Sequence, residues 1–492
     1  MPLVLDRFRS WNYFLPGLED APIITDLFSG HEAKYHPQSP LRASFSKLCM
    51  VDAVHPPSPI PQPQRIGTRF PSIHKLPTEL IADIFALCHA MEEDDRQNSV
   101  TDCARVILSH VCSRWRAVIL SMPLVWATIS VRGPKDSSLP RLKAHLERSA
   151  SCPLSLRFVA HVSTAKQKGE HIEDIVAPAI AHARRWKSLH IFLDDTHTPV
   201  ISNMLRTTSF PSLETLELSV RDWEPEDAHH VLDALSSSCR LQNLMWHGPG
   251  GLPPSTRWAA LAKIRIFNFL SLPEVHTLLS QCHNVTDLRI SISRAPHSPL
   301  DGMALITLSK LEVLWLSTKS VLDDLFDRLC LPKLKRLIIE NHCPNPSHDR
   351  SCRSLDSFLA RCHCDLDALV LRDSHKSPEA LDQLLRLPTL GTLRDLRIEL
   401  PPLSDLTLET LTQRMDGACV LPRLENLTFR RSYSTDGMLG EMATSRFRGA
   451  DRELPVNCLK RLQTALDSSR PMDIWALDAL EAQGMEIDYG YW

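Results

Sequence analysis

The sequence predicts an α/β chain in which a short all-helical segment precedes an irregular solenoid of repeats, each built from one strand and one helix. Three observations lead to this prediction. An apolar motif recurs between residues 186 and 429, two apolar stripes at helical spacing lie ahead of it, and a proline-rich stretch sets off residues 1–70.

The recurring motif is an apolar residue, two variable residues, a second apolar residue, one variable residue and a third apolar residue. Its ten copies begin at Trp186, Leu213, Leu241, Leu261, Val285, Leu311, Leu334, Leu366, Leu393 and Leu424. Successive copies start 20 to 32 residues apart. A recurrence of this length is typical of a solenoid, in which each unit buries its apolar face only against its neighbours. Such arrays present long surfaces, so we expect this part of the chain to bind another macromolecule.

The array is expected to span residues 127–455, with less regular members ahead of the ten copies. Apolar residues at 124–131 and 154–158 are spaced as in strands, and residues 139–150 between them have helical character. The first repeats of an array are commonly atypical because one of their faces meets water.

Residues 456–492 are expected to cap the array. Residues 459–466 and 472–482 have the composition of helices, and Gly484 suits a helix C-cap. Met485, Ile487 and Tyr489 alternate as in a final strand.

Residues 1–70 show no sustained hydrophobic period. Residues 56–63 contain five prolines in eight positions, which favours an extended, polyproline-like tether. A proline-rich ligand for a partner domain is the alternative interpretation of the same composition.

Two amphipathic helices are predicted within residues 71–126. The first starts at Leu76-Pro77, because proline suits the first helical turn and Glu79 favours the positive end of the helix dipole. Its apolar stripe consists of Leu80, Ile81, Ile84, Phe85 and Cys88. The second stripe consists of Ala104, Ile107, Leu108, Val111, Cys112, Trp115, Val118 and Ile119. The acidic stretch from Glu92 between them is expected to be a solvated loop. Because two helices of this length can form only a small core, we expect the stripes to be buried partly against a partner.

Composition excludes several classes of function. The 55 basic and 58 acidic residues give a net charge of −3, which offers no argument for nucleic acid or an anionic membrane as a partner. No glycine-rich phosphate-binding motif occurs, and no run of eighteen apolar residues predicts a membrane span. The N-terminus does not resemble a signal peptide, so the 14 cysteines are expected to be reduced thiols in the cytoplasm or nucleus.

No cofactor, metal site or catalytic residue is predicted. Cysteine and histidine are concentrated in residues 342–364, but their spacing does not match the two short pairs that a zinc site usually has. Buried thiols at the ends of helices are the preferred explanation for Cys239, Cys282, Cys330 and Cys362. The many Asp and His residues belong to no recognisable motif with a nucleophile.

Residues 73–126 resemble an F-box. The resemblance rests on Leu76-Pro77-Thr-Glu-Leu-Ile-Ala-Asp-Ile-Phe85, on Val111-Cys-Ser-Arg-Trp-Arg116 and on Met122-Pro-Leu-Val-Trp126, a sequence that often follows the box in fungal members. It implies a module that binds a Skp-family adaptor and thereby joins a cullin–RING ubiquitin ligase. The implied adaptor-binding residues are Leu76, Pro77, Leu80, Ile81, Ile84, Val111 and Trp115. The spacer at residues 89–103 is longer than in compact members of the family.

Residues 124–492 resemble the leucine-rich-repeat array of F-box proteins. The family pattern places Asn or Cys eight positions after the first apolar residue of each repeat, but this chain has no such ladder. Residues at that offset include Asp194, Arg221, Pro249, Ser293 and His342. The resemblance therefore implies an irregular array.

The variable residue between the second and third apolar positions of each copy is expected to point outward from its strand. Those residues are His190, Glu217, Met245, Arg265, Arg289, Trp315, Ile338, Val370, Arg397 and Thr428. Arg and Trp are enriched among residues that dominate binding energy. Arg265, Arg289, Trp315 and Arg397 are therefore the predicted target-binding residues, able to accept an acidic or phosphorylated segment. The alternative is that they are ordinary solvated strand residues partnered by Asp287 and Asp395.

These expectations combine into a substrate-recognition subunit of a cullin–RING ubiquitin ligase of the SCF type. The chain would bind the adaptor through the F-box and an unknown target protein through the repeats, with no active site of its own. One alternative is an F-box scaffold without a role in ubiquitin transfer. Another, from a different class, is a zinc-binding protein or an enzyme built on a repeat scaffold.

Overall fold

The computed structural model describes most of the chain from residue 73 onward. The described ranges are 73–95, 103–132, 138–160, 172–193, 198–206, 208–220, 223–249, 251, 256–293, 303–319, 321–342, 348–373, 377–400, 403–413, 419–430, 432–447, 458–466 and 469–491. The predicted tether at 56–63 lies outside them. The chain divides into two compact units, Met1–Ser121 (unit 1) and Met122–Trp492 (unit 2).

The described part of unit 1 is helical. Its elements are a short 3-10 turn η1 (Ile73–Lys75) and the helices α4 (Thr78–Asp95), α5 (Cys103–Val111) and α6 (Ser113–Leu120). The predicted second helix is two helices, because Cys112 is extended (φ −159°, ψ 169°) and its Sγ accepts a hydrogen bond from Trp115 N at the start of α6. The solvated loop predicted from Glu92 was also placed too early, since α4 continues to Asp95.

Unit 1 has a small apolar core. Ile81 and Phe85 of α4 are almost fully buried, and the Phe85 ring packs edge-on against Trp115 of α6 with 5.0 Å between ring centroids. The Arg114 side chain donates a 2.7 Å hydrogen bond to the Leu76 carbonyl oxygen. This bond ties the segment before α4 to α6.

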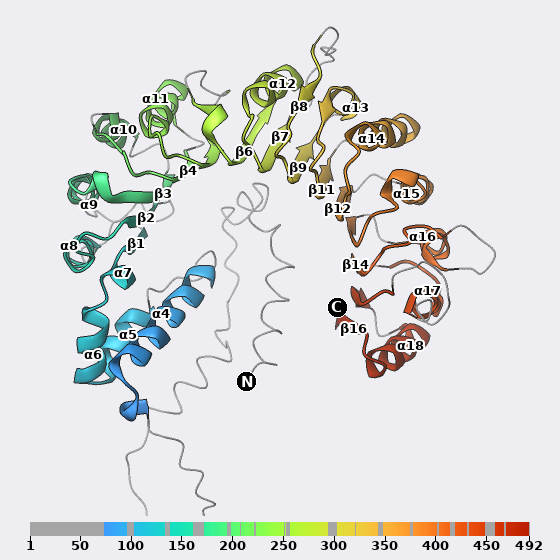
Figure 1. Ribbon diagram of the computed structural model, residues 1–492, viewed down its shortest axis with the longest axis horizontal. Coiled ribbons are helices and arrows are strands. Elements are labelled where there is room, and N and C mark those ends of the chain that lie inside the picture. Colours follow the sequence, from blue (N-terminus) through green and yellow to red (C-terminus); the bar gives the residue numbers. More distant parts are fainter. Residues whose placement is uncertain are drawn as a thin grey trace, which may run out of the picture. The chain divides into compact units, whose positions relative to one another are not determined.

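Unit 2 is mixed α/β and contains a long parallel sheet whose strand order follows the chain (Figure 1). Its strands are β1 (Thr128–Arg132), β2 (Leu154–Ala160), β3 (Trp186–Leu193), β4 (Thr215–Ser219), β5 (Asn243–His247), β6 (Lys263–Leu270), β7 (Asp287–Ile292), β9 (Val313–Thr318), β11 (Arg336–Asn341), β12 (Ala368–Asp373), β13 (Asp395–Leu400), β14 (Asn426–Phe429), β15 (Arg461–Leu466) and β16 (Glu486–Tyr491). A separate small pair is formed by β8 (Ile306–Thr307) and β10 (Leu329–Cys330). Strands that pair in chain order are what stacked repeats produce.

Helices follow most strands and lie along the outer side of the sheet in Figure 1, with the strands on the inner side. They are α8 (Ser138–Arg148), α9 (Ile172–Ile180), α10 (Thr198–Arg206), α11 (Pro225–Ser236), α12 (Leu272–Gln281), α13 (Asp323–Phe326), α14 (His348–Cys362), α15 (Pro378–Leu385), α16 (Asp405–Leu411), α17 (Met438–Phe447) and α18 (Pro471–Ala482). The short helix α7 (Pro123–Trp126) precedes β1. In the described residues, β5 is followed by the single 3-10 turn η5 (Trp258–Ala260) and β9 by the short helix α13, and these repeats are the shortest, with 20 and 23 residues between the starts of successive copies. This accounts for part of the uneven spacing in the sequence.

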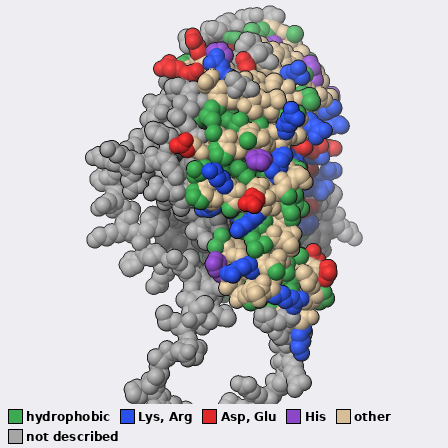
Figure 2. All heavy atoms as spheres, turned by 90° about the vertical axis from the view of Figure 1, so that its left-hand side faces the viewer, with side chains coloured by type: hydrophobic (Ala, Val, Ile, Leu, Met, Phe, Trp, Pro, Cys, Tyr) green, Lys and Arg blue, Asp and Glu red, His purple; other side chains and the backbone are tan. Residues whose placement is uncertain are grey.

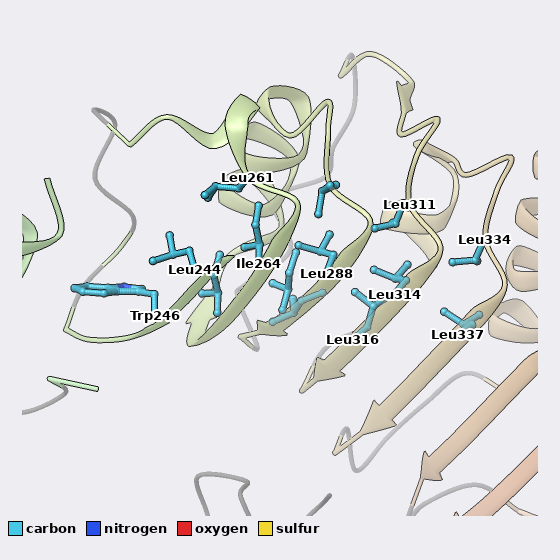
Figure 3. Close-up of a cluster of buried hydrophobic side chains, with 14 of the residues drawn as sticks. Leu244, Trp246, Leu261, Ile264, Leu288, Leu311, Leu314, Leu316, Leu334 and Leu337 are labelled. Carbon is cyan, nitrogen blue, oxygen red and sulfur yellow. The ribbon is translucent and has the colours of Figure 1, made fainter. Parts of the chain in front are cut away.

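Each of the ten predicted copies contributes one strand, and the middle apolar residues of all copies align. The register pairs Leu216 with Leu244, Leu244 with Ile264 and Ile264 with Leu288. It extends in the same way to Ile129 in β1 and to Ile487 in β16. The first, second and third apolar residues point into the space between strands and helices (Figure 3). Of the thirty residues, only Ile339 is not fully buried.

The ends of the array agree with prediction in most respects. Helix α8 matches the predicted stretch 139–150, α18 matches 472–482 and β16 is the predicted final strand. Gly484 has φ +102°, and Met485 N donates to the Leu480 carbonyl, which is the C-terminal bond pattern that glycine favours. The helix predicted at 459–466 was wrong. These residues include strand β15, because they pair with β14 and β16 on both sides.

None of the helices in the described ranges has the length and apolar character needed to cross a lipid bilayer.

The middle apolar residues that align from strand to strand are called the apolar ladder. The ladder predicts that substitutions at neighbouring positions of one strand differ greatly in their effect on the free energy of unfolding. Leu337 is fully buried, whereas Arg336 points to the opposite face and is exposed. We expect Leu337→Ala to lower the free energy of unfolding by about 3 kcal/mol, because it leaves a cavity between two layers. Arg336→Ala is the matched control and should change it by less than about 0.5 kcal/mol in urea denaturation. Similar losses in the two variants would contradict the ladder.

Candidate binding surfaces

The outward residues predicted from the repeat form one continuous row across the sheet. The register aligns Ser130, Arg157, His190, Glu217, Met245, Arg265, Arg289, Trp315, Ile338, Val370, Arg397, Thr428, Gln463 and Asp488. Arg265 is exposed, and Arg289, Trp315 and Arg397 are partly exposed. Ile338, Val370 and Thr428 are nearly buried despite their outward register. We call this line of side chains the outward row.

A stack of cations and rings occupies the middle of the outward row. The guanidinium carbon of Arg289 lies 3.4 Å from the centroid of the Trp315 ring and 4.8 Å from that of Phe267. Arg372 approaches the same Trp315 ring at 5.0 Å. Stacking of this kind holds a guanidinium in place while leaving it charged. The Trp315 ring is therefore the fixed centre of a cationic surface.

Arg265 and Arg289 are direct neighbours on β6 and β7. Like charges at directly opposed positions of neighbouring strands destabilise a sheet unless they are compensated. Part of the compensation comes from Glu217, whose pKa the charge of Arg265 helps to lower, and from Glu340, whose pKa the charge of Arg289 helps to lower. The next residues along the row, Met245 and Trp315, carry no charge. The structure thus brings together three of the four predicted target-binding residues. Arg397 stands apart, because Ile338 and Val370 on β11 and β12 lie between it and Trp315.

Arg372 is a member of this surface that sequence reasoning missed. Its Nε and Nη2 donate to the Glu399 carboxylate at 2.8 and 3.1 Å. Burial raises the pKa of the nearby Glu340, but a hydrogen bond from His342 and the charges of Arg372 and Arg289 outweigh it and hold that pKa low. On β12, Arg372 follows the outward-row residue Val370 by two positions. Its partner Trp315 lies two strands away on β9, and its partner Glu399 lies on the adjacent strand β13. No single repeat could have revealed it.

A second polar group links β3 and β4. Ser188 Oγ lies 2.8 Å from His190 Nε2, and His190 Nδ1 lies 2.5 Å from Glu217 Oε2. Burial raises the pKa of Glu217, but the hydrogen bond and charge of His190, with Arg265 and Arg157, lower it overall. The carboxylate therefore stays ionised and fixes the imidazole. His190 and Glu217 were predicted to point outward, but their pairing was not, since they are separated by a whole repeat.

Hydrolases also contain a serine, a histidine and a carboxylate linked by hydrogen bonds in this order. A hydrolytic centre, however, also needs hydrogen-bond donors that stabilise an oxyanion. Ser188 lies in β3, which pairs with β2 on one side and β4 on the other. Its neighbouring peptide N–H groups therefore belong to the sheet. We interpret the three side chains as a structural link on the outward face.

The cysteine- and histidine-rich segment does not converge on one point in the described residues. No group of three or more His, Cys, Asp or Glu side chains is placed there, or elsewhere in those ranges, to hold a metal ion. Cys343 lies outside the described residues. Cys362 is buried, accepts a hydrogen bond from Leu331 N at 3.1 Å, and has a raised pKa because of its hydrogen bond with Cys364 and burial.

The predicted role of thiols at helix ends holds for two of the four cysteines. Cys282 and Cys362 are buried at or next to the C-terminal ends of α12 and α14, and burial raises the pKa of Cys282 to about 12. Cys239 is exposed, and Cys330 lies on the short strand β10. For these two the prediction was wrong: after α11 the buried residue is Ser238, whose Oγ donates to the Leu213 carbonyl, and Cys330 is half-buried in a strand that pairs with β8.

One buried polar residue replaces part of the missing asparagine ladder. Asn268 lies in the irregular end of β6, where its Oδ1 accepts from Gly248 N at 3.0 Å and its Nδ2 donates to Gly248 O. It sits one position before the offset read from the sequence, so the pattern missed it. The two bonds satisfy backbone groups of the neighbouring repeat.

The residues predicted to bind an adaptor fall into three groups by exposure. Pro77, Leu80 and Val111 are exposed, with 48% of the Leu80 surface and 51% of the Val111 surface accessible. Leu76, Ile84 and Trp115 are half-buried. Ile81 is buried and supports α4 from inside. The exposed members are thus available to a partner, and the others hold the helices that carry them.

Comparisons with protein-family models and with curated proteins gave no match for this chain.

The link between β3 and β4 predicts a pH-dependent contribution to stability. Because the pKa of Glu217 is lowered in the folded state, its contribution is present above the unfolded carboxyl range and is lost as the pH falls through the folded pKa. We expect Glu217→Gln to lower the free energy of unfolding by about 1–2 kcal/mol at pH 7. The difference from wild type should shrink as the pH falls below the unfolded carboxyl range of about 4.3 and vanish only below the lowered folded pKa.

The control is Glu214→Gln, which removes the exposed ion pair between Lys187 of β3 and the residue just before β4. Urea denaturation from neutral to acidic pH should show little effect of this substitution at any pH. A pH-independent effect of Glu217→Gln would argue against a lowered pKa.

Proposed function

We propose that the chain is the substrate-recognition subunit of an SCF-type cullin–RING ubiquitin ligase. In this proposal the helices of residues 71–126 bind a Skp-family adaptor as an F-box, and the outward row of unit 2 binds a target protein. The observation that carries the proposal is the apolar surface that unit 1 leaves exposed.

The described helices of unit 1 expose many large apolar side chains for so small a module. They are Ile73, Leu80, Leu87, Val106, Ile107, Val111 and Leu120. Ile107 and Leu87 expose 52% and 64% of their surfaces. Figure 2 shows hydrophobic side chains at the surface, interspersed with basic, acidic and histidine side chains. Exposed apolar area of this kind is expected where a helical module is completed by a partner.

The position of these side chains fits the F-box resemblance. Leu80 lies one turn after the exposed Pro77, and Val111 closes α5. These are three of the seven residues that the resemblance assigns to adaptor binding, and none is needed to fill the core of the unit. A requirement for adaptor contact explains why apolar residues occupy these positions.

For unit 2 we propose an irregular leucine-rich-repeat-like solenoid. The support is one strand per copy, an aligned apolar ladder and strand order along the chain. Departures from the regular pattern include the sparse asparagine ladder and the units that lack a long helix.

The proposed target site is the cationic centre around Arg265, Arg289 and Trp315. Two arginines at paired positions of neighbouring strands, one with its guanidinium group fixed on an aromatic ring, suit an acidic or phosphorylated segment. The proposal assigns no chemical step to the chain. Its contribution is to hold a target lysine near a ubiquitin-charged enzyme in the complex, in the cytoplasm or nucleus.

Removing the exposed start of α4 should abolish adaptor binding. We expect Pro77→Ala with Leu80→Ala to reduce recovery of the adaptor and cullin by about tenfold or more when the tagged chain is purified from cells. Folding should not suffer, because both side chains are exposed.

Leu305→Ala, which removes an equally exposed leucine from unit 2, is the matched control and should leave recovery unchanged. Equal recovery of adaptor with the double variant and wild type would contradict the F-box assignment. Recovery of adaptor but no cullin with wild type would favour the scaffold alternative.

Reversing the central charges should affect target binding without affecting the adaptor. We expect Arg265→Glu with Arg289→Glu to lower at least one co-purifying protein by about tenfold in proteasome-inhibited cells, with the adaptor unchanged. Arg336→Glu, a reversal two residues before the outward-row residue Ile338 on β11, is the control. If mass spectrometry finds every co-purifying protein at its wild-type level, the target site lies elsewhere.

A further inference from the structure

A second group of exposed apolar side chains lies in the last repeats of unit 2, on and beside the helices. Leu406 belongs to α16, Tyr433 to the segment before α17, and Met472 and Trp475 to α18. Trp475 and Tyr433, at 73% and 71%, are the most exposed large apolar side chains in the described residues. We call these four residues the C-terminal apolar patch.

Hydrogen bonds fix the start of α18 to the segment before α17. The Asp436 carboxylate accepts from Met472 N at 3.2 Å and from Asp473 N at 3.0 Å. In return, the fully buried Asp473 carboxylate accepts from Gly437 N and Gly440 N at 3.0 and 2.9 Å. The two helix starts cap one another, so Met472 is held in place.

The same segment is tied to α16. Tyr433 N donates to the Leu403 carbonyl at 2.8 Å, just before α16 begins. Arg470 donates to the Ser432 carbonyl at 2.9 Å from the other side. Hydrogen bonds between three successive repeats therefore hold the backbone of the patch in place. The exposure of its side chains is not that of an unstructured loop.

Helix α18 directs one face at the sheet and another outward. Asp473, Leu477 and Leu480 are buried, which sets the inner face. Trp475 lies opposite, and Ala479 and Ala482 follow it at helical spacing and are exposed. A large ring followed by two small residues forms a shallow surface on which another helix can lie.

The exposed charges on the three helices α16, α17 and α18 have one sign. Every exposed charged side chain on α16, α17 and α18 is a carboxylate: Glu409, Glu441, Asp478 and Glu481. The one basic residue in these helices, Arg446, is buried. A second copy of the chain would place the same carboxylates against each other, and a nucleic acid or an anionic membrane would be repelled.

We propose that α16–α18 form a docking surface for a basic amphipathic helix of a partner protein. Its apolar side chains pack on Trp475, Met472 and Tyr433, and its Lys or Arg side chains face Asp478 and Glu481. This surface is separate from the adaptor-binding helices and the outward row, so it does not depend on the proposed ligase function.

The test uses the full chain and a fluorescent peptide of about 18 residues, built from Leu and Lys at amphipathic helical spacing. A matched peptide carries Glu in place of every Lys. In fluorescence anisotropy we expect the Lys peptide to bind and the Glu peptide not to bind. Met472→Ala with Trp475→Ala should weaken binding about tenfold or more.

Two further variants complete the design. Asp478→Asn with Glu481→Gln should weaken binding and reduce its salt dependence, because it leaves the apolar side chains intact. Phe269→Ala removes an exposed ring from β6 and should have no effect. All substituted side chains are exposed, and thermal melting checks that each variant is folded.

The proposal is overturned if the Met472/Trp475 variant binds as wild type does, or if the Glu peptide binds equally well. It is also overturned if light scattering shows self-association that Trp475→Ala abolishes, since the occupant is then a second copy. Binding to phosphatidylserine vesicles that depends on Trp475 would identify a membrane surface instead.

Discussion

The structure of unit 2 depends on one constraint: no repeat can bury its apolar residues alone. Each strand contributes two inward residues, and each is covered by the strands on both sides and by the layer of helices. The ladder from Ile129 to Ile487 is therefore continuous, and breaking it at any point exposes the units on both sides. This requirement keeps the strands in register even where the intervening segments differ in length.

Register in turn decides which outward side chains become neighbours. Residues that occupy the same position in successive repeats lie next to each other, so Arg265 meets Arg289 and His190 meets Glu217. The cationic centre and the polar link between β3 and β4 both follow from this geometry. Outward side chains can differ from repeat to repeat because the inward residues, not the outward ones, fill the core.

The two exposed apolar surfaces differ in their surroundings. In unit 1 the exposed leucine, isoleucine and valine side chains crowd a small helical module, and the resemblance to an F-box offers an explanation for them. The C-terminal apolar patch rests on buried capping bonds around Asp473, and the exposed charges on its three helices are carboxylates. The first suggests a module completed by an adaptor, and the second suggests a separate partner with positive charge.

The sequence by itself determined the repeat, the strand that each of the ten copies forms, and the direction of the outward residues, because these follow from local apolar periodicity. It did not reveal that residues 459–466 form a strand, since pairing with both neighbours overrides local propensity. It also could not reveal the break at Cys112 or the stacking of Arg289 and Arg372 on Trp315. Those features join residues from different repeats or helices, so only the tertiary structure decided which side chains meet.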